Sequence, residues 1–376
     1  MSKTPILDCE EPVPDVRLKR GYRYCRMGVL AGGAVGLYLA FAGRPLPNPA
    51  ESPLFLMLGC LLAFYIAVLV HELGHLVAGI ASAFEFHGIG VGVFLLNKSA
   101  RGFKVRIVPR RIVVGGYTRM YARSSGDLVK RSMWVTVGGP VATVLLLIAT
   151  ILSPWSFLIG CILVVNSFLS LAALIPYVVQ GHASDAKRIL ILAKKGPDSD
   201  RLAAITYLLA LDARGIEPRD WPGELLEKAT MATIDTTFRG TEHGLRCVVA
   251  LNSGNAEAIA GALEQGLAWS HEVSPEERRA WFAIASYFQG IFRNNASLAS
   301  AWLRRAYNVK GAVSEKARDS KPLAAVAFAE GKYAEAREHL QHYIADLDRG
   351  ALSGMTAAER ARVVALMNQA SALSDR

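Results

Sequence analysis

The chain has 376 residues, of which 52% are hydrophobic, and its mean hydropathy of +0.27 is high for a soluble protein. We therefore expect a membrane protein with a soluble part, within the two or three domains that this length allows. The formal net charge of +10 does not predict nucleic-acid binding, because the basic residues gather at the ends of apolar runs and form no single face with interleaved aromatic residues. The five cysteines lack CxxC spacing, which argues against a disulfide framework or a cysteine zinc site.

The N-terminal segment, residues 1–26, is polar, of mixed charge and rich in arginine and lysine at its end, and we expect it to be a cytoplasmic tail. A glycine-rich apolar run over residues 27–43 follows and is barely long enough to span a membrane. It ends in the A-x-A pattern Ala40-Phe41-Ala42, so a cleaved signal peptide is the alternative to a first span. The length and the acidic residues of the preceding tail favour the span.

The second apolar run, residues 53–84, contains the ionisable residues His71, Glu72 and His75. Such side chains usually mark a site at membrane depth, because each costs roughly 2.5 to 3.5 kcal/mol at the centre of a spanning helix. In H-E-x-x-H on a helix, the two histidines share one face and can hold a zinc ion, with the glutamate positioned as general base. The motif predicts metalloprotease chemistry with His71 and His75 as metal ligands and Glu72 as the catalytic base.

Two further apolar runs, residues 133–152 and 155–175, bring the expected number of spans to about four. Lysine and arginine are concentrated in residues 1–26 and 85–132, whereas the loops on the other side contain only Arg44. The positive-inside rule then predicts that both termini are cytoplasmic. The two histidines of the motif are accordingly expected toward the cytoplasmic leaflet.

Residues 85–132 change to a strand pattern, with expected strands at roughly 87–95, 103–108 and 112–118 and turn material at 97–102. A small sheet at the membrane surface would present an edge to an extended peptide, because edge N–H and C=O groups are ready partners for an added strand. An ordinary cytosolic hairpin loop is an equal alternative at this point.

From residue 196 onward the pattern is that of soluble helices. One helix start is well marked, because Ser274, Pro275 and Glu277 are an N-cap, a proline at the first position and a glutamate at the third. Residues 329–336 resemble the middle of a tetratricopeptide repeat (TPR), and residues 281–306 resemble a degenerate copy. We expect only a helical-repeat-like array, since the spacing between the two copies exceeds the usual length of about 34 residues.

A catalytic zinc site usually takes three protein ligands and leaves a fourth position for water, so a third ligand is needed. The strongest candidate follows the last apolar run, in the stretch Ser184-Asp185-Ala186-Lys187-Arg188. His182 is an alternative ligand or a neighbour of the site, although a surface histidine is the simpler interpretation.

Residues 53–190 resemble the site-2 protease family of intramembrane zinc metalloproteases, peptidase family M50. That family combines a membrane-embedded H-E-x-x-H with an N-x-x-P…D-G motif on a later span. Four pieces of this sequence occur in the family's order: His71-Glu72-Leu73-Gly74-His75, Gly115-Gly116-Tyr117, Gly138-Gly139-Pro140 and Ser184-Asp185-Ala186. Only the first and the last are specific taken alone.

The resemblance implies that Asp185 is the third zinc ligand and that Gly115, Gly116 and Tyr117 help to hold the substrate in extended form. Two positions depart from the family pattern. Ala173 stands where the family has its asparagine, and Ala186 replaces the glycine after the aspartate. Asn166, about two helical turns earlier, would supply a similar amide to the substrate, although not in the same register.

The expected fold is therefore mainly α. It comprises a cytoplasmic tail (1–26), a polytopic helical membrane core of about four spans with a small β-hairpin insertion (27–192), and an all-α, TPR-like cytoplasmic domain (198–376). We expect an integral protein of an inner or cytoplasmic membrane that binds one Zn²⁺ per chain. A protein partner at the C-terminal domain is expected as well, and nucleic acid is not.

The predicted function is an intramembrane zinc endopeptidase that cuts a single-span membrane protein within or near its transmembrane segment, in regulated intramembrane proteolysis that releases a regulator. The alternative is a proteolytically inactive, zinc-stabilised scaffold that recruits partners through its helical domain. Glu72 favours the enzyme, because a scaffold needs metal ligands but no base, whereas Ala173 argues mildly for the scaffold.

Overall fold

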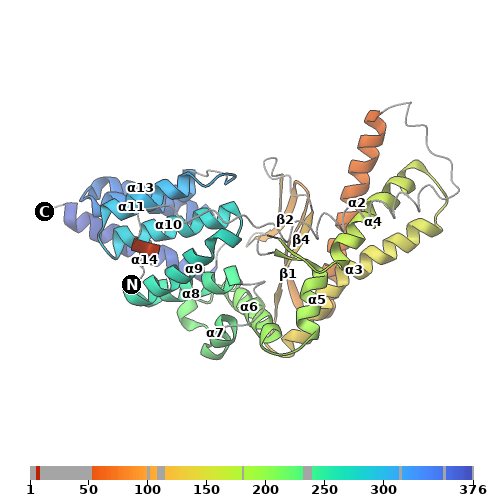
Figure 1. The fold of residues 1–376 in the computed structure, drawn as a ribbon, viewed down its shortest axis with the longest axis horizontal. Coiled ribbons are helices and arrows are strands. Elements are labelled where there is room, and N and C mark those ends of the chain that lie inside the picture. Colours follow the sequence, from red (N-terminus) through yellow and green to blue (C-terminus); the bar gives the residue numbers. More distant parts are fainter. Residues whose placement is uncertain are drawn as a thin grey trace. The chain divides into compact units, whose positions relative to one another are not determined.

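The structure is a computed structural model that describes residues 6–8, 53–99, 102–107, 115–179, 182–231, 239–312, 316–349 and 353–374. Internal contacts divide the chain into two compact units, which we call the membrane unit (Lys19–Tyr207) and the helical unit (Met1–Leu18 with Leu208–Arg376). The division falls within helix α6 (Pro197–Ala213). Each unit is described separately below (Figure 1).

Three helices of the membrane unit are long and apolar enough to cross a membrane: α2 (Pro53–Ala81), α3 (Leu128–Leu152) and α4 (Phe157–Leu174). They confirm the helices expected from the second, third and fourth apolar runs. Many of their large apolar side chains are exposed, as expected of side chains that face lipid, and Val77, Leu145 and Leu152 are examples. The first expected span, residues 27–43, lies outside the described residues.

Helices α2 and α3 approach each other closely at two glycines. A Cβ atom built on Gly74 would lie 2.3 Å from the carbonyl oxygen of Gly138, and one on Gly138 would lie 2.3 Å from the carbonyl oxygen of Gly74. Small residues allow the backbones of membrane helices to touch in this way. The crossing point is next to His75, so it determines which part of α3 faces the histidine motif.

The segment between α2 and α3 forms a four-stranded antiparallel sheet in the order β3-β2-β1-β4. Its strands are β1 (Phe84–Val91), β2 (Phe94–Ser99), β3 (Gly102–Ile107) and β4 (Gly116–Ala122). The sequence predicted a small hairpin insertion here, and the structure has a four-stranded sheet instead. The single strand expected over 87–95 was wrong, because the chain reverses at Gly92, whose φ of 57° lies in the left-handed region that glycine adopts readily.

After α4, a two-stranded ribbon leads to helix α5 (Asp185–Ala193). The ribbon pairs β5 (Val178–Val179) with β6 (His182–Ala183) in antiparallel register. Part of α6 also belongs to the membrane unit, since Ala203 packs against Phe84, Ala122 and Leu128 in one apolar cluster. This cluster joins the sheet to the start of α3.

The helical unit contains the following described elements, drawn from green to blue in Figure 1 except for the N-terminal one: η1 (Ile6–Asp8), η2 (Pro218–Asp220), α7 (Gly223–Thr230), α8 (Arg239–Ser253), α9 (Ala256–Trp269), η3 (Ser270–Glu272), α10 (Pro275–Ile291), α11 (Ala296–Tyr307), α12 (Lys316–Ala329), α13 (Tyr333–Arg349) and α14 (Gly354–Ser374). Consecutive helices pack in pairs, α8 with α9, α10 with α11 and α12 with α13, and α10 also packs against α12. The TPR-like assignment stays a prediction.

Two local features of the helical unit follow from its sequence. The predicted start of α10 is confirmed, because Ser274 and Glu277 form a capping box with Pro275 at the first position. Gly290 lies where a Cβ atom would be 2.3 Å from the carbonyl oxygen of Ala325, so a glycine is needed for α10 to approach α12. The short N-terminal element η1 also packs into this unit, with Leu7 in its apolar core.

Candidate metal centre and active site

The structure brings the three predicted metal ligands together. Nε2 of His71 and Nε2 of His75 are 3.2 Å apart, and Oδ2 of Asp185 lies 3.0 Å from the first and 3.5 Å from the second. These residues come from α2 and from the first position of α5. Among the described residues they are the one group of histidine, cysteine and acidic side chains whose ligand atoms converge in this way.

The other nitrogen of each imidazole is held by a contact to α3. Nδ1 of His75 lies 2.7 Å from the carbonyl oxygen of Val135, which can only accept a hydrogen bond. The amide N–H of Gly139 lies 3.3 Å from the same nitrogen, and we take the shorter contact as the one that sets the tautomer. Nδ1 therefore carries the proton and Nε2 keeps its lone pair for a metal.

The contacts of His71 assign its ring the same tautomer as that of His75. Its Nδ1 lies 2.7 Å from Oγ1 of Thr143, and the hydroxyl of Thr143 already donates to the carbonyl oxygen of Gly139 at 2.9 Å. The hydroxyl oxygen must accept from Nδ1, which again leaves Nε2 unprotonated. Metal-ligating histidines commonly donate their second ring N–H to such a partner, so the contacts around both rings fit metal ligation.

Asp185 is placed by the cap of its own helix. The Ser184 hydroxyl accepts from the backbone N–H of Lys187 and donates to the carbonyl oxygen of Ile175 at 2.8 Å, which ties the start of α5 to the end of α4. Oδ2 of Asp185 faces Nε2 of both histidines, and the ionised form of a carboxylate is the one that binds a metal.

The space beside the two histidines depends on a glycine. A Cβ atom on Gly139 would lie 2.3 Å from Nε2 of His75 and 2.8 Å from Nε2 of His71. A larger residue would thus press against the nitrogen of each ring that is available to a metal. Two imidazoles and one carboxylate are a donor set that zinc accepts in catalytic sites, and the residues present therefore fit a zinc ion.

Comparison with protein-family models gives a match over residues 59–347, which includes the H-E-x-x-H motif, Asp185 and most of the helical unit. The chain belongs to peptidase family M50. No significant match was found among curated proteins or among solved structures. Membership in this family and the apolar helices identify an integral membrane protein of a metalloprotease family.

The predicted base of this M50 chain, Glu72, follows His71 on α2 and is 4% exposed. Its Oε2 atom accepts a hydrogen bond of 2.7 Å from the hydroxyl of Thr118 on β4. A Cβ atom on Gly116 would lie 2.7 Å from Oε1 of Glu72, so the glycine at the start of β4 leaves room for the carboxylate. Strand β4 therefore passes directly beside the predicted base.

The residues predicted to contact substrate fall in two places. Gly115 is at the bend before β4, and Gly116 and Tyr117 begin the strand, which is an edge strand in the strand order of the described sheet. Asn166 on α4 is fully buried instead, and its amide donates to the carbonyl oxygen of Thr143 at 2.9 Å. Its Oδ1 atom has no hydrogen-bond partner among the described residues. The roles of these four residues stay predictions.

Several contacts of the site were not anticipated from the sequence. Thr118, Thr143 and the carbonyl group of Val135 hold the base and the two histidines, and no local pattern marks any of them. The N-cap role of Ser184 was not predicted either, although serine followed by Asp-Ala-Lys is compatible with a helix start. The side chain of His182 lies outside what the structure describes, so its role as an alternative ligand stays open to experiment.

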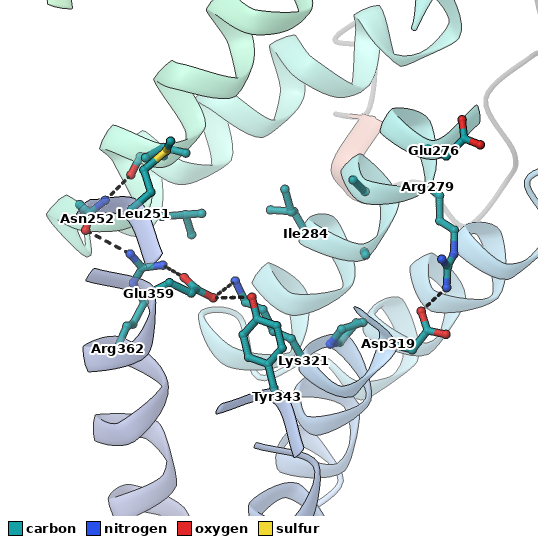
Figure 2. A pocket seen from close by; sticks show the side chains of 15 residues that line it. Leu251, Asn252, Glu276, Arg279, Ile284, Asp319, Lys321, Tyr343, Glu359 and Arg362 are labelled. Carbon is teal, nitrogen blue, oxygen red and sulfur yellow. Dashed lines mark hydrogen bonds and ion pairs between the residues drawn. The ribbon is translucent and has the colours of Figure 1, made fainter. Parts of the chain in front are cut away.

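The helical unit has a cavity of its own, of about 400 Å³, lined by α8, α10, α12, α13 and α14 (Figure 2). At one end Glu359 accepts from Lys321 at 2.5 Å and from Arg362 at 2.6 Å. At the other end Arg279 pairs with Asp319. These charges pair with one another across helices, so they stabilise the packing of the unit. The predicted protein partner of this domain stays a prediction.

The two carboxylates of the cavity have different environments. Burial raises the pKa of Asp319 above its ordinary value, although Arg279 opposes this effect. Burial also acts to raise the pKa of Glu359, but Lys321 and Arg362 outweigh it and hold that pKa below its ordinary value. Glu359 is therefore the carboxylate whose charge the fold stabilises.

Proposed function

We propose that the protein is an intramembrane zinc endopeptidase that hydrolyses a peptide bond within or near the transmembrane segment of a single-span membrane protein. One observation carries the proposal: Oδ2 of Asp185 converges with Nε2 of His71 and Nε2 of His75 beside the buried Glu72, and the latter three residues lie in a helix long enough to span a membrane. Membership in peptidase family M50 supports the same chemistry.

The reaction needs an activated water and a polarised carbonyl group. A bound Zn²⁺ supplies both, because it lowers the pKa of a coordinated water toward about 7 and acts as a Lewis acid. Glu72 accepts the proton of the water at its carboxylate and can return it to the leaving amine. The hydrogen bond from Thr118 to Oε2 orients this carboxylate, and the contacts to Val135 and Thr143 keep the two Nε2 lone pairs directed at the metal position.

The substrate must lose its helical structure before it is cut, because a membrane helix has all of its amide groups paired internally. Strand β4 is suited to receive the unwound segment. It is an edge strand that begins at Gly116 next to Glu72, and an extended peptide added along it would lie beside the base. We propose that Gly115, Gly116 and Tyr117 bind the substrate backbone in this way and that the cleavage releases a regulator.

We further propose that the protein lies in an inner or cytoplasmic membrane with both termini in the cytoplasm. The packing of Leu7 into the core of the helical unit supports this arrangement, since two segments that form one core lie on the same side of a membrane. Both ends of a chain lie on the same side of a membrane when the number of spans is even. The structure describes three candidate spans, α2, α3 and α4, and the further span predicted at residues 27–43 would make the number even.

The inactive scaffold is not supported. A scaffold requires the ligands but not a buried carboxylate with its own hydrogen-bond donor, and here Glu72 is 4% exposed and bonded to Thr118. Burial of a carboxylate carries an energetic cost that a purely structural metal site has no need to incur.

The decisive experiment replaces Glu72 with glutamine. Glu72 is not a ligand in the H-E-x-x-H arrangement, so Glu72→Gln should keep the zinc while the cleavage rate falls by about 100-fold or more, the usual contribution of a general base. Wild type co-expressed with tagged single-span proteins should give a shortened product that the variant does not give. Glu85→Gln, in the sheet, is the matched control and should cleave normally. Equal complementation of a deletion phenotype by wild type and Glu72→Gln would favour the scaffold instead.

A further inference from the structure

The N-terminal element η1 packs against α9, α10 and α11 of the helical unit, and we call the residues of these helices that contact it the η1 groove. One residue of each helix contributes a polar contact to η1: Glu264, Gln289 and Trp302. The partners are separated by 257 to 295 positions in the chain. Most of these contacts are to the backbone of η1, and its backbone groups are recognised in both directions, as donors and as acceptors.

On the donor side, a single carboxylate binds two backbone N–H groups. The N–H of Ile6 donates to Oε2 of Glu264 at 3.0 Å, and the N–H of Leu7 donates to Oε1 at 2.6 Å. The first N–H groups of a helical turn have no partner within the turn, and a carboxylate is the acceptor best suited to them. Glu264 on α9 thus caps a helical turn that belongs to a distant part of the chain.

On the acceptor side, two buried donors meet one carbonyl group. The side-chain amide of Gln289 and the indole N–H of Trp302 both donate to the carbonyl oxygen of Leu7, at 2.9 Å each. Gln289 is 1% exposed and Trp302 is 0% exposed. Both donors are satisfied by this one carbonyl oxygen, and buried donors without a partner are rare in folded proteins. The two side chains are therefore matched to a backbone carbonyl group of η1.

The side chains of η1 add a modest specificity. Leu7 is 2% exposed and belongs to the apolar core of the helical unit, against which Ile6 is partly buried. Asp8 accepts a second contact from the amide of Gln289, at 3.2 Å. An apolar residue, a leucine and an acidic residue in succession are thus the pattern that the groove accommodates.

We propose that the groove between α9, α10 and α11 is a peptide-binding site whose resident ligand is the chain's own segment Ile6–Asp8, and that a separate peptide of this sequence binds the same site when the resident segment is removed. A few backbone hydrogen bonds and one buried side chain are the features of a docked peptide, which can exchange. The residues of this site differ from those of the metal centre, and peptide binding here is a property separate from the proposed protease function.

The first test uses the full chain in detergent with residues 1–10 deleted and a fluorescent peptide of residues 1–15. The deleted chain should bind the peptide saturably, and the intact chain should bind it at least about tenfold more weakly, because its own segment already occupies the site and competes as an intramolecular ligand. A peptide carrying Leu7→Asp should not bind. Absence of saturable binding to a deleted chain that retains the wild-type melting transition would overturn the proposal.

Matched variants locate the binding to the groove. In the deleted chain, Glu264→Gln should weaken peptide binding by roughly tenfold or more, the usual effect of losing hydrogen bonds to a charged acceptor. Glu257→Gln makes the same change on the same helix at a side chain that is 86% exposed, and it should leave binding unchanged. Equal affinities of the two variants would show that the peptide binds elsewhere, which also overturns the proposal.

A measurement on the intact chain covers the case in which the deleted chain does not fold. Hydrogen exchange should show the amides of Ile6 and Leu7 protected, since both donate to Glu264. Glu264→Gln should speed exchange at both amides by about tenfold, and Glu257→Gln should not. Exchange of these amides at the rate of an unfolded peptide in the wild-type chain would contradict a bound segment.

Discussion

Thr118 lies opposite Glu72, and its hydroxyl group approaches both the carboxylate and the backbone of that residue. Oγ1 is 2.7 Å from Oε2 of Glu72 and 3.0 Å from its carbonyl oxygen. A hydroxyl group has one proton to donate, and a charged acceptor makes the stronger bond. The contact joins β4, the proposed substrate strand, to the predicted base, so that this strand orients the carboxylate.

Replacing Thr118 should therefore impair catalysis without removing the metal. Thr118→Val keeps the shape but loses the donor, and we expect kcat to fall by about tenfold while KM and zinc content change little, since one hydrogen bond to a charged group contributes roughly 1.5 to 3 kcal/mol. Thr118→Ser retains the hydroxyl and should recover most of the rate. A valine variant as active as the serine variant would show that this bond does not position the base.

Zinc content should depend on Asp185 and not on His182. Outer contacts of a metal site typically contribute 10- to 100-fold in affinity, so loss of a direct ligand in Asp185→Ala should lower affinity by more than about 100-fold. Metal analysis of the purified protein should find about one zinc per wild-type chain. His182→Ala should retain this content. The opposite dependence would transfer the third ligand to His182.

Gly139→Ala should weaken metal binding for a steric reason. The added methyl group would lie 2.3 Å from Nε2 of His75, which forces the ring or α3 to move. We expect a loss of zinc affinity of about tenfold or more, the range seen when the surroundings of a metal ligand are disturbed. Gly126→Ala is the control, because no heavy atom lies within 4 Å of its added methyl group. Equal zinc retention in both variants would indicate that the metal lies elsewhere.

The orientation of the chain can be checked with reporter fusions. Reporters placed after Arg376 and within residues 85–132 should both be cytoplasmic, because basic residues are concentrated in the loop and both termini are proposed to share one side. A reporter between α3 and α4, at residues 153–154, should be external. An external reporter after Arg376 would contradict the proposed orientation.

The ion-pair network of the helical unit should contribute to stability in a pH-dependent way. The side chain of Glu359 is 15% exposed, and Glu359→Gln would leave the partly buried Lys321 and Arg362 without their carboxylate. Loss of one hydrogen-bonding partner typically costs about 1 to 3 kcal/mol when the remaining group is shielded from water. We expect a loss of this order in the free energy of unfolding near neutral pH, measured by denaturant titration. Glu224→Gln, at an exposed pair with Lys228, should cause no measurable change.

The sign of the pH dependence follows from the lowered pKa of Glu359. Because the carboxylate is charged more readily in the folded state, its contribution is complete above the unfolded pKa of about 4.3 and is lost as pH falls through the folded pKa. The difference in unfolding free energy between wild type and Glu359→Gln should thus be constant above about pH 6 and shrink at acidic pH. A difference that grows on acidification would contradict the assignment.

The strands show where sequence patterns stop being sufficient. Residues 87–95 read as one apolar strand, but the chain reverses at Gly92 and pairs Val91 with Phe94. A glycine is compatible with both outcomes, and the choice depends on which strands are available to pair. The helices α2, α3 and α4 were predictable because a membrane span requires about 20 consecutive apolar residues, which is a local property.

The residues of the candidate site also fall into two groups, those that the sequence could assign and those that it could not. His71, Glu72 and His75 could be assigned from the chain alone, because a spacing of four residues places side chains on one helix face wherever that helix lies. The positions of Thr118, Thr143 and Gly139 relative to them could not. Those residues come from β4 and α3, and only the close crossing of α2 with α3 at Gly74 and Gly138, together with the sheet register, brings their atoms within hydrogen-bond or contact distance of the motif. Pairings between segments far apart in the chain leave no periodic trace in the sequence, so the tertiary structure alone decides them.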